Sequence, residues 1–182
     1  MKKTQRTPTP GTKKVFSPQD EQSLRDLYRE HSQSVYGYLL SLCKNRLQAE
    51  EITQDVFVSC CRQLGKALLL KSPKLYLLKT ARNRWIDLQR SENRNQINQK
   101  KYTENYLVHV SSTDPSDSVT EKERSWHLEQ SLNKLPVEQK EVILFRLYQS
   151  MNFKDIANIM DTSVSTTAAR YRLGIEKLKE YY

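Results

Sequence analysis

The stretch that decides the fold reads SMNFKDIANIMDTSVSTTAARYRLGIEKL and runs from Ser150 to Leu178. Its spacing predicts two helices joined by a tight corner at residues 161–163. Asn152 and Ser163 are suited to cap these helices, because a short polar side chain can accept a hydrogen bond from a free backbone N–H. The stretch therefore predicts a helical hairpin that ends in a longer second helix.

Each helix of this hairpin is expected to have one apolar stripe. In the second helix, the side opposite the stripe carries short polar side chains and then arginines, and it has no acidic residue before Glu176. Small groups allow close approach to a major groove and arginine reaches bases or phosphates, so this face suits DNA; an ordinary helical hairpin is the alternative. The first stripe is Phe153, Ile156, Ala157 and Met160, the second is Val164, Ala168, Tyr171, Ile175 and Leu178, and the polar face is Ser165, Thr166, Ala169, Arg170 and Lys177, with Arg172 at its flank.

The composition of the 182-residue chain limits its fold class and its partners. Glycine occurs only 4 times and segments with a 3.6-residue period dominate, so we predict an all-α fold. The formal net charge of +9 and the pI of about 9.4 indicate a polyanionic partner, nucleic acid before membrane. No apolar run approaches the ~20 residues of a membrane span, and the basic N-terminus lacks the apolar segment of a secretory signal.

The sequence offers no pattern that is typical of a catalytic or metal site. Its three histidines lack cysteines or carboxylates at ligand spacing, and we expect His31 to be a core residue. Cys43, Cys60 and Cys61 are an odd number and are interpreted as reduced thiols of a cytosolic protein. No Ser/His/Asp set or phosphate-binding glycine loop is present, so we expect no catalytic residue, metal or cofactor.

Irregular segments divide the rest of the chain. Residues 1–19 are a basic, proline-containing tail, and residues 99–119 are a polar linker. We therefore predict two small helical bundles, residues 20–98 and 120–182, joined by a flexible linker, and the sequence leaves open whether they pack together. The predicted helices before the hairpin span Asp20–Cys43, Gln48–Leu64 and Pro73–Arg94, then a region from Thr120 through Leu132, and Val137–Tyr148.

Two predicted helices of the first bundle carry unusual charge. The Gln48–Leu64 helix has an acidic face, which is either a solvated face or a docking surface for a basic protein, and spacing alone favours the solvated face. In the helix from Pro73, basic residues alternate with Tyr76 and Trp85, a combination that can hold a phosphate backbone and unstacked bases. A core tryptophan among solvated arginines is the alternative, and for Trp85 alone we favour it.

Two separated blocks of the sequence point to one family. The first is AEEITQDVF, Ala49–Phe57, followed by YLLKTARNRWIDLQR, Tyr76–Arg90. The second is LNKLPVEQKEVILFRLYQSMNFKDIANIMDTSVSTTAARYRLGIEKL, Leu132–Leu178. In this order they resemble a bacterial RNA polymerase sigma factor of the compact extracytoplasmic-function (ECF) type.

The resemblance implies that the chain binds core RNA polymerase, directs it to specific promoters and assists promoter melting, in the cytoplasm and without catalysis. It implies that the acidic helix docks on the β′ coiled coil and that the second bundle packs on the β flap. An anti-sigma factor often accompanies the family, although the sequence shows none. The implied sites are Glu50, Glu51, Gln54, Asp55 and Phe57 for core polymerase; Lys79, Arg82, Asn83, Arg84, Trp85, Asp87 and Arg90 for the minus-ten non-template strand; and Ser165, Thr166, Thr167, Ala169, Arg170, Arg172 and Lys177 for the minus-thirty-five element.

The chain departs from the family pattern at several positions. Asp161 stands where glycine is common, which the corner tolerates because aspartate adopts left-handed backbone more readily than most residues. Ser165 and Thr167 replace the usual Gly and Val, and Tyr76 replaces the usual Trp, so promoter preference does not carry over. The alternative function is a stand-alone helix-turn-helix transcriptional regulator, which would need a dimer interface and a palindromic site.

Overall fold

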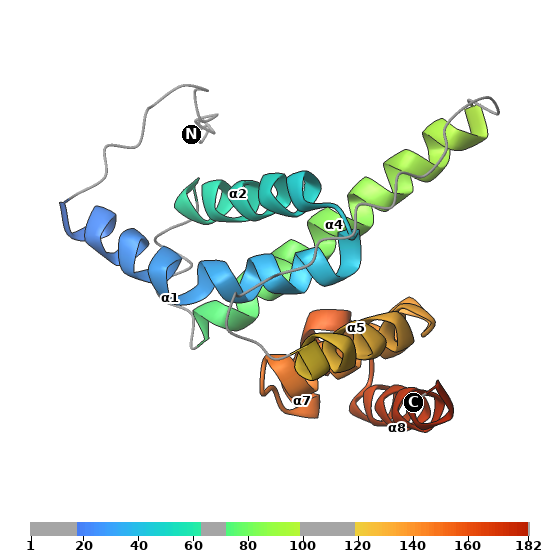
Figure 1. Cartoon of the computed structure of the whole chain (residues 1–182). Helices are drawn as coiled ribbons and strands as arrows, with labels where there is room; N and C mark the ends of the chain where they lie inside the picture. Colours follow the sequence, from blue (N-terminus) through green and yellow to red (C-terminus); the bar gives the residue numbers. More distant parts are fainter. Residues whose placement is uncertain (1–17, 63–71, 99–118, 182) are drawn as a thin grey trace, which may run out of the picture.

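The computed structural model describes residues 18–62, 72–98 and 119–181, and every regular element in these ranges is helical (Figure 1). The all-α prediction is therefore confirmed. The predicted N-terminal tail and most of the linker lie outside the described residues. The elements are α1 (Pro18–Cys43), α2 (Arg46–Arg62), α4 (Pro73–Asn98), α5 (Val119–Asn133), α6 (Val137–Ile143), the π-helical turn η1 (Leu144–Tyr148), α7 (Phe153–Met160) and α8 (Val164–Tyr181).

Capping interactions set the ends of the helices in the hairpin. Asn152 Oδ1 accepts a hydrogen bond from the Asp155 N–H at 2.9 Å, and Ser163 Oγ accepts one from the Thr166 N–H at 3.0 Å. Between them, Asp161 has left-handed backbone with φ 50°, and the Thr162 N–H donates to the Ala157 carbonyl at 3.0 Å. The predicted caps and corner are confirmed, and they fix where α7 stops and α8 starts.

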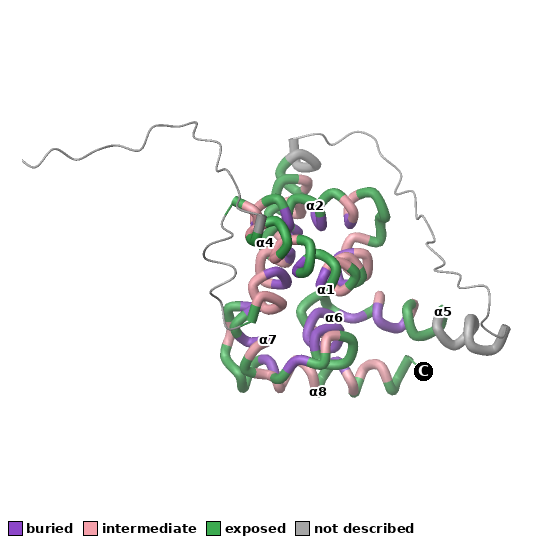
Figure 2. Tube along the Cα trace, turned by 90° about the vertical axis from the view of Figure 1, so that its left-hand side faces the viewer, coloured by how far each residue is buried: buried purple, intermediate pink, exposed green. Residues whose placement is uncertain are grey.

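The N-terminal helices α1, α2 and α4 pack on one another, and the C-terminal half of α4 projects past the other helices (Figure 1). The C-terminal helices α5–α8 lie beneath α1 and α4, so that α2 and α8 are at opposite sides of the molecule in both views (Figures 1 and 2). Fully buried side chains from both groups, among them Leu39, Leu78, Phe145 and Ile156, belong to one continuous cluster. The two groups of helices are therefore packed together, which the sequence had left open.

Some predicted faces differ from the observed ones. Val164, assigned to the apolar stripe of the second hairpin helix, is 49% exposed. The buried side of α8 instead includes Thr167 and Gly174, and a methyl group at Gly174 would lie 2.8 Å from Ile143 Cδ1, so α6 and α8 approach too closely for a larger residue. The helix predicted over Val137–Tyr148 ends in the π-helical turn η1, where the Gln149 N–H donates to the Leu144 carbonyl.

Phe145→Ala should lower the free energy of unfolding by about 3–5 kcal/mol, because it empties a fully buried site. The ring of Phe145 stacks on Tyr38 of α1 at 4.6 Å between centroids, so the loss affects both groups of helices. Leu147→Ala, at a neighbouring position that is 55% exposed, should change the same quantity by less than about 0.5 kcal/mol. Urea denaturation followed by circular dichroism measures the free energy of unfolding of both variants. A loss for Phe145→Ala as small as that for Leu147→Ala would contradict a core shared by the two groups of helices.

Candidate nucleic-acid and protein interfaces

One side of α8 carries the accessible polar and basic side chains of the hairpin. Ser165, Thr166 and Arg172 are exposed, and Ala169, Arg170 and Lys177 are partly so. Thr167 is fully buried and its hydroxyl donates to the Ser163 carbonyl at 2.9 Å, so this side chain holds the first turn of the helix and does not face outward. Six of the seven residues predicted on this helix therefore share an accessible side.

The exposed side of α4 carries Asn83, Arg84, Asp87 and Arg90. Arg90 and Asp87 approach each other at 3.8 Å, but both side chains are about 70% exposed, so the pair holds neither of them firmly. Trp85 is buried among core side chains, and its Nε1 has no hydrogen-bond partner among the described residues. Trp85 is therefore a core residue in this structure, as the spacing of the sequence alone favoured.

Two other basic residues predicted on α4 contact the C-terminal helices. Lys79 Nζ lies 2.6 Å from Asp161 Oδ1 and also donates to the Asn158 carbonyl at 2.8 Å. Arg82 binds Glu141 through two hydrogen bonds, Nε to Oε1 at 2.9 Å and Nη2 to Oε2 at 3.3 Å. These side chains are thus engaged within the chain.

Glu141 is the most enclosed charged group of this contact. Its side chain is 1% exposed and that of Arg82 is 13% exposed. The Tyr38 hydroxyl donates to Glu141 Oε1 at 2.8 Å, and burial together with the nearby Glu141 carboxylate holds the pKa of Tyr38 well above its usual range. Tyr38 therefore stays protonated and serves as a second donor to the carboxylate.

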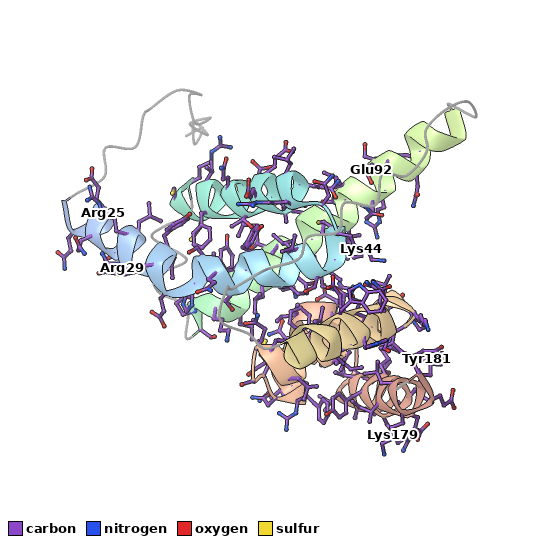
Figure 3. All side chains as sticks on the ribbon, viewed as in Figure 1. Arg25, Arg29, Lys44, Glu92, Lys179 and Tyr181 are labelled. Carbon is purple, nitrogen blue, oxygen red and sulfur yellow. The ribbon has the colours of Figure 1, made fainter. Side chains whose placement is uncertain are left out.

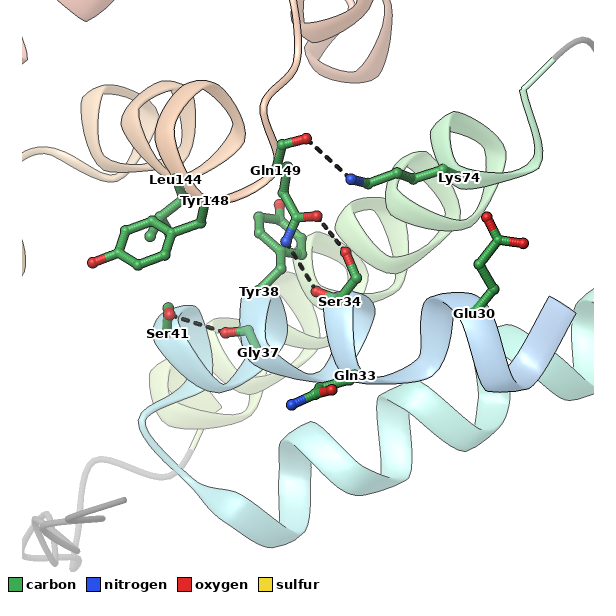
Figure 4. Close-up of a pocket in the computed structure, with 10 residues that line it drawn as sticks. All are labelled: Glu30, Gln33, Ser34, Gly37, Tyr38, Ser41, Lys74, Leu144, Tyr148 and Gln149. Carbon is green, nitrogen blue, oxygen red and sulfur yellow. Dashed lines mark hydrogen bonds between the residues drawn. The ribbon is translucent and has the colours of Figure 1, made fainter. Parts of the chain in front are cut away.

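Further hydrogen bonds join the C-terminal helices to α1 and to the start of α4. The Gln149 side chain exchanges hydrogen bonds with Ser34, and the Gln149 carbonyl accepts one from Lys74 Nζ at 3.0 Å, beside a cleft of about 520 Å³ (Figure 4). Lys140 donates to the Ser41 carbonyl in the last turn of α1; burial, with Lys44 nearby, lowers its pKa to about 8. We call the whole contact the junction: Ser34, Tyr38, Ser41, Lys74, Lys79 and Arg82 on one side, and Lys140, Glu141, Phe145, Gln149, Asn158 and Asp161 on the other.

The acidic face predicted on α2 is on the outside of the molecule. Glu51, Gln54 and Asp55 are exposed, and Glu50 pairs with Arg46 at 3.0 Å. Phe57 is buried and packs edge-to-face on Tyr28 at 4.9 Å between ring centroids, so it supports the helix from inside.

A groove that the sequence analysis missed borders this acidic face. It holds about 230 Å³ between α1 and α2. The sequence gives no signal for this groove beyond the tyrosines of α1, of which Tyr28 and Tyr36 line it. The groove is lined by Tyr28, Ser32, Gln33, Tyr36, Glu50, Thr53 and Gln54.

Charged side chains elsewhere point outward from the helices, as Arg25 and Arg29 do on α1 and Lys179 does near the end of α8 (Figure 3). Glu92 on α4 accepts a hydrogen bond from Gln48 Nε2 of α2 at 2.9 Å. Within the described ranges, no three His, Cys, Asp or Glu side chains are grouped to hold a metal ion. Nor is any described helix both long and apolar enough to span a bilayer.

Comparison with protein families matches two regions of the chain. Residues 27–95, which include α2 and most of α4, match the family described as Sigma-70 region 2. Residues 127–178, which include α7 and most of α8, match Sigma-70, region 4. The two matches occur in one chain and in the order that the sequence blocks predict.

Characterised relatives match along most of their length. The chain is 27% identical over 158 residues to RNA polymerase sigma factor YlaC of Bacillus subtilis, covering 85% of this chain and 91% of the relative. It is 26% identical over 169 residues to ECF RNA polymerase sigma factor SigK of a Mycobacterium species, covering 88% and 83%.

A solved structure shares the fold. The sigma factor RpoE of Bartonella quintana, crystallised with the anti-sigma factor NepR, aligns with a TM-score of 0.69 at 19% identity, covering 91% of this chain and 97% of that one. At this low sequence identity, the similarity is evidence for a shared fold alone.

Thr167→Ala should lower the free energy of unfolding by about 1–3 kcal/mol, because it removes a buried hydrogen bond and a buried methyl group. Thr166→Ala changes the adjacent exposed residue and should cost less than about 0.5 kcal/mol. Thermal denaturation measures both. If the two changes had equal effects, Thr167 would not have the internal role that the structure gives it.

Proposed function

Because the chain belongs to the sigma-70 family and is an RNA polymerase sigma factor of the ECF type, we propose that its two groups of helices divide the work of promoter recognition. As a sigma factor the chain binds core RNA polymerase and promoter DNA and directs initiation. In our proposal, residues 20–98 bind the polymerase and the melted minus-ten strand, and residues 120–182 bind the minus-thirty-five duplex. The observation that carries the proposal is the pairing of both sigma regions with exposed polar faces on α2, α4 and α8.

The exposed acidic side of α2 supports the assignment of the polymerase contact. Glu51 and Asp55, with the polar Gln54 between them, give a negative surface on a chain with a net charge of +9, so a basic partner is attracted there while DNA is repelled. We propose that this surface meets the β′ coiled coil, with the adjoining α1–α2 groove receiving part of the same partner. A stand-alone helix-turn-helix regulator does not require such a surface, and it is therefore the less favoured alternative.

The two DNA contacts are proposed to act through one polymerase. Short polar side chains at the start of α8 allow close approach to a major groove, and Arg170 and Arg172 reach bases or phosphates. Asn83, Arg84 and Arg90 on α4 face outward, where they can bind a single strand. Each contact is weak alone, and the second becomes intramolecular once the first is made. In this proposal the chain recruits polymerase to the promoter and binds the separated strand, and it catalyses no reaction. We propose that it acts in the cytoplasm, where core polymerase acts.

Run-off transcription with purified core polymerase tests the function. We expect the chain, with no other protein added, to start specific transcripts from promoters of its own host. Asp55→Arg should abolish both the transcripts and co-purification with core polymerase, because it reverses the charge at the centre of the acidic face. Glu180→Arg makes the same charge change at an exposed site on α8 and should preserve both. Absence of any transcript from the unmodified chain would refute the proposal.

Arg170→Ala and Asn83→Ala should separate duplex recognition from strand opening. Arg170→Ala should weaken binding of the holoenzyme to minus-thirty-five duplex by about 1–3 kcal/mol, roughly 5- to 150-fold. Asn83→Ala should leave that binding unchanged and slow open-complex formation, measured by permanganate reactivity of unpaired thymines. An unchanged opening rate for Asn83→Ala would remove this residue from the minus-ten contact.

A further inference from the structure

The outer side of α8 carries a leucine among its polar and basic side chains. Leu173 is 45% exposed, whereas Tyr171, Ile175 and Leu178 of the same helix pack on the apolar clusters of the core. The next residue, Gly174, is buried against α6, and α8 itself lies at the edge of the molecule (Figure 2). A single exposed leucine is common on protein surfaces, so its role has to be judged from the side chains around it.

Leu173 lies within the face of α8 that we assign to duplex DNA, so this inference rests on that proposed function. It follows Ala169 by one helical turn, and the two side chains form an apolar strip along the helix. Successive residues of a helix turn by about 100°, so Arg170 and Arg172 lie about 80° to either side of this strip. Apolar groups between two cations match a major groove, in which the base edges lie between two phosphate backbones.

Acidic side chains mark the end of this strip. Glu176 and Glu180 are exposed on the next two turns of the same side, where DNA phosphates would repel them. From Ser165 to Leu173 the helix rises about 12 Å at about 1.5 Å per residue, which corresponds to three or four base pairs at about 3.4 Å each. Leu173 is therefore the last side chain of the strip that is placed to reach a base.

Thymine is the base whose edge in the major groove includes a methyl group, whereas the edges of the other bases offer hydrogen-bonding groups. Leucine makes no hydrogen bond through its side chain, so it gains by burying the thymine methyl group and loses by covering a polar edge. We propose that Leu173 recognises a thymine of the minus-thirty-five element through contact with its 5-methyl group. The sequence analysis missed this residue, because Leu173 fits neither the buried stripe of α8 nor its polar face.

Replacing thymine by uracil tests the proposal, because this change removes the methyl group and leaves the hydrogen-bonding groups in place. The probe is a duplex with the minus-thirty-five element of a promoter that the holoenzyme transcribes in the run-off assay. Each thymine of either strand is replaced in turn, and the affinity of the holoenzyme is measured by competition in a mobility-shift assay. At one or two positions the loss should be about three- to fivefold, as expected for burial of one methyl group.

Leu173→Ala should weaken binding of the thymine duplex by a similar factor and should abolish the further loss caused by uracil at those positions. Leu147→Ala makes the same change at another exposed leucine, outside α8, and should retain the full uracil effect. Arg172→Ala should weaken binding of both duplexes equally and make binding less dependent on salt, because it removes a charge and leaves the methyl contact in place.

The proposal would be overturned if uracil had no effect at any position, or if the element had no thymine in either strand. An undiminished uracil effect in Leu173→Ala would overturn it as well. None of these results would alter run-off transcription or the loss expected for Arg170→Ala, so failure of this inference is distinguishable from failure of the proposed function. An unchanged affinity of Arg170→Ala would instead remove α8 from the duplex contact, and this inference with it.

Discussion

One buried carboxylate constrains how the two groups of helices can pack on each other. Glu141 is 1% exposed, and an unpaired charge at such a site would be too costly to keep. Its two partners come from different helices, Arg82 from α4 and Tyr38 from α1. The need to pair this group therefore limits where α6 can lie against α4 and α1, and Phe145, one turn further along, stacks on the ring of Tyr38 within the shared apolar cluster.

The hairpin that reads duplex DNA in our proposal is built by a different kind of interaction. Its caps at Asn152 and Ser163 and its left-handed corner at Asp161 are all made within the hairpin itself. The internal geometry of α7 and α8 is thus set locally, whereas their position relative to α4 is set by the junction.

The same distinction explains what could be predicted from the sequence. Caps and apolar stripes act over a few residues and leave a periodic pattern, so the helices, the corner and the accessible side of α8 were predictable. The pairing of Arg82 with Glu141 joins residues 59 positions apart and leaves no such pattern. Thr167 was assigned to DNA binding only through the family resemblance; the polar face read from the spacing did not include it, and in the structure it is buried. The π-helical turn η1 has no signal in the spacing of apolar residues.

An ion pair is a poor choice if stability alone is required at the junction. Apolar residues of similar volume in place of a buried ion pair are often as stabilising or more so. Such residues could hold α4 and α6 together, but they would not define the direction in which one helix lies against the other. The two hydrogen bonds from Arg82 to Glu141 have a fixed geometry, so they set this direction. The apolar cluster that includes Leu78 and Phe145 therefore supplies most of the burial between the two groups of helices, and the ion pair supplies its orientation.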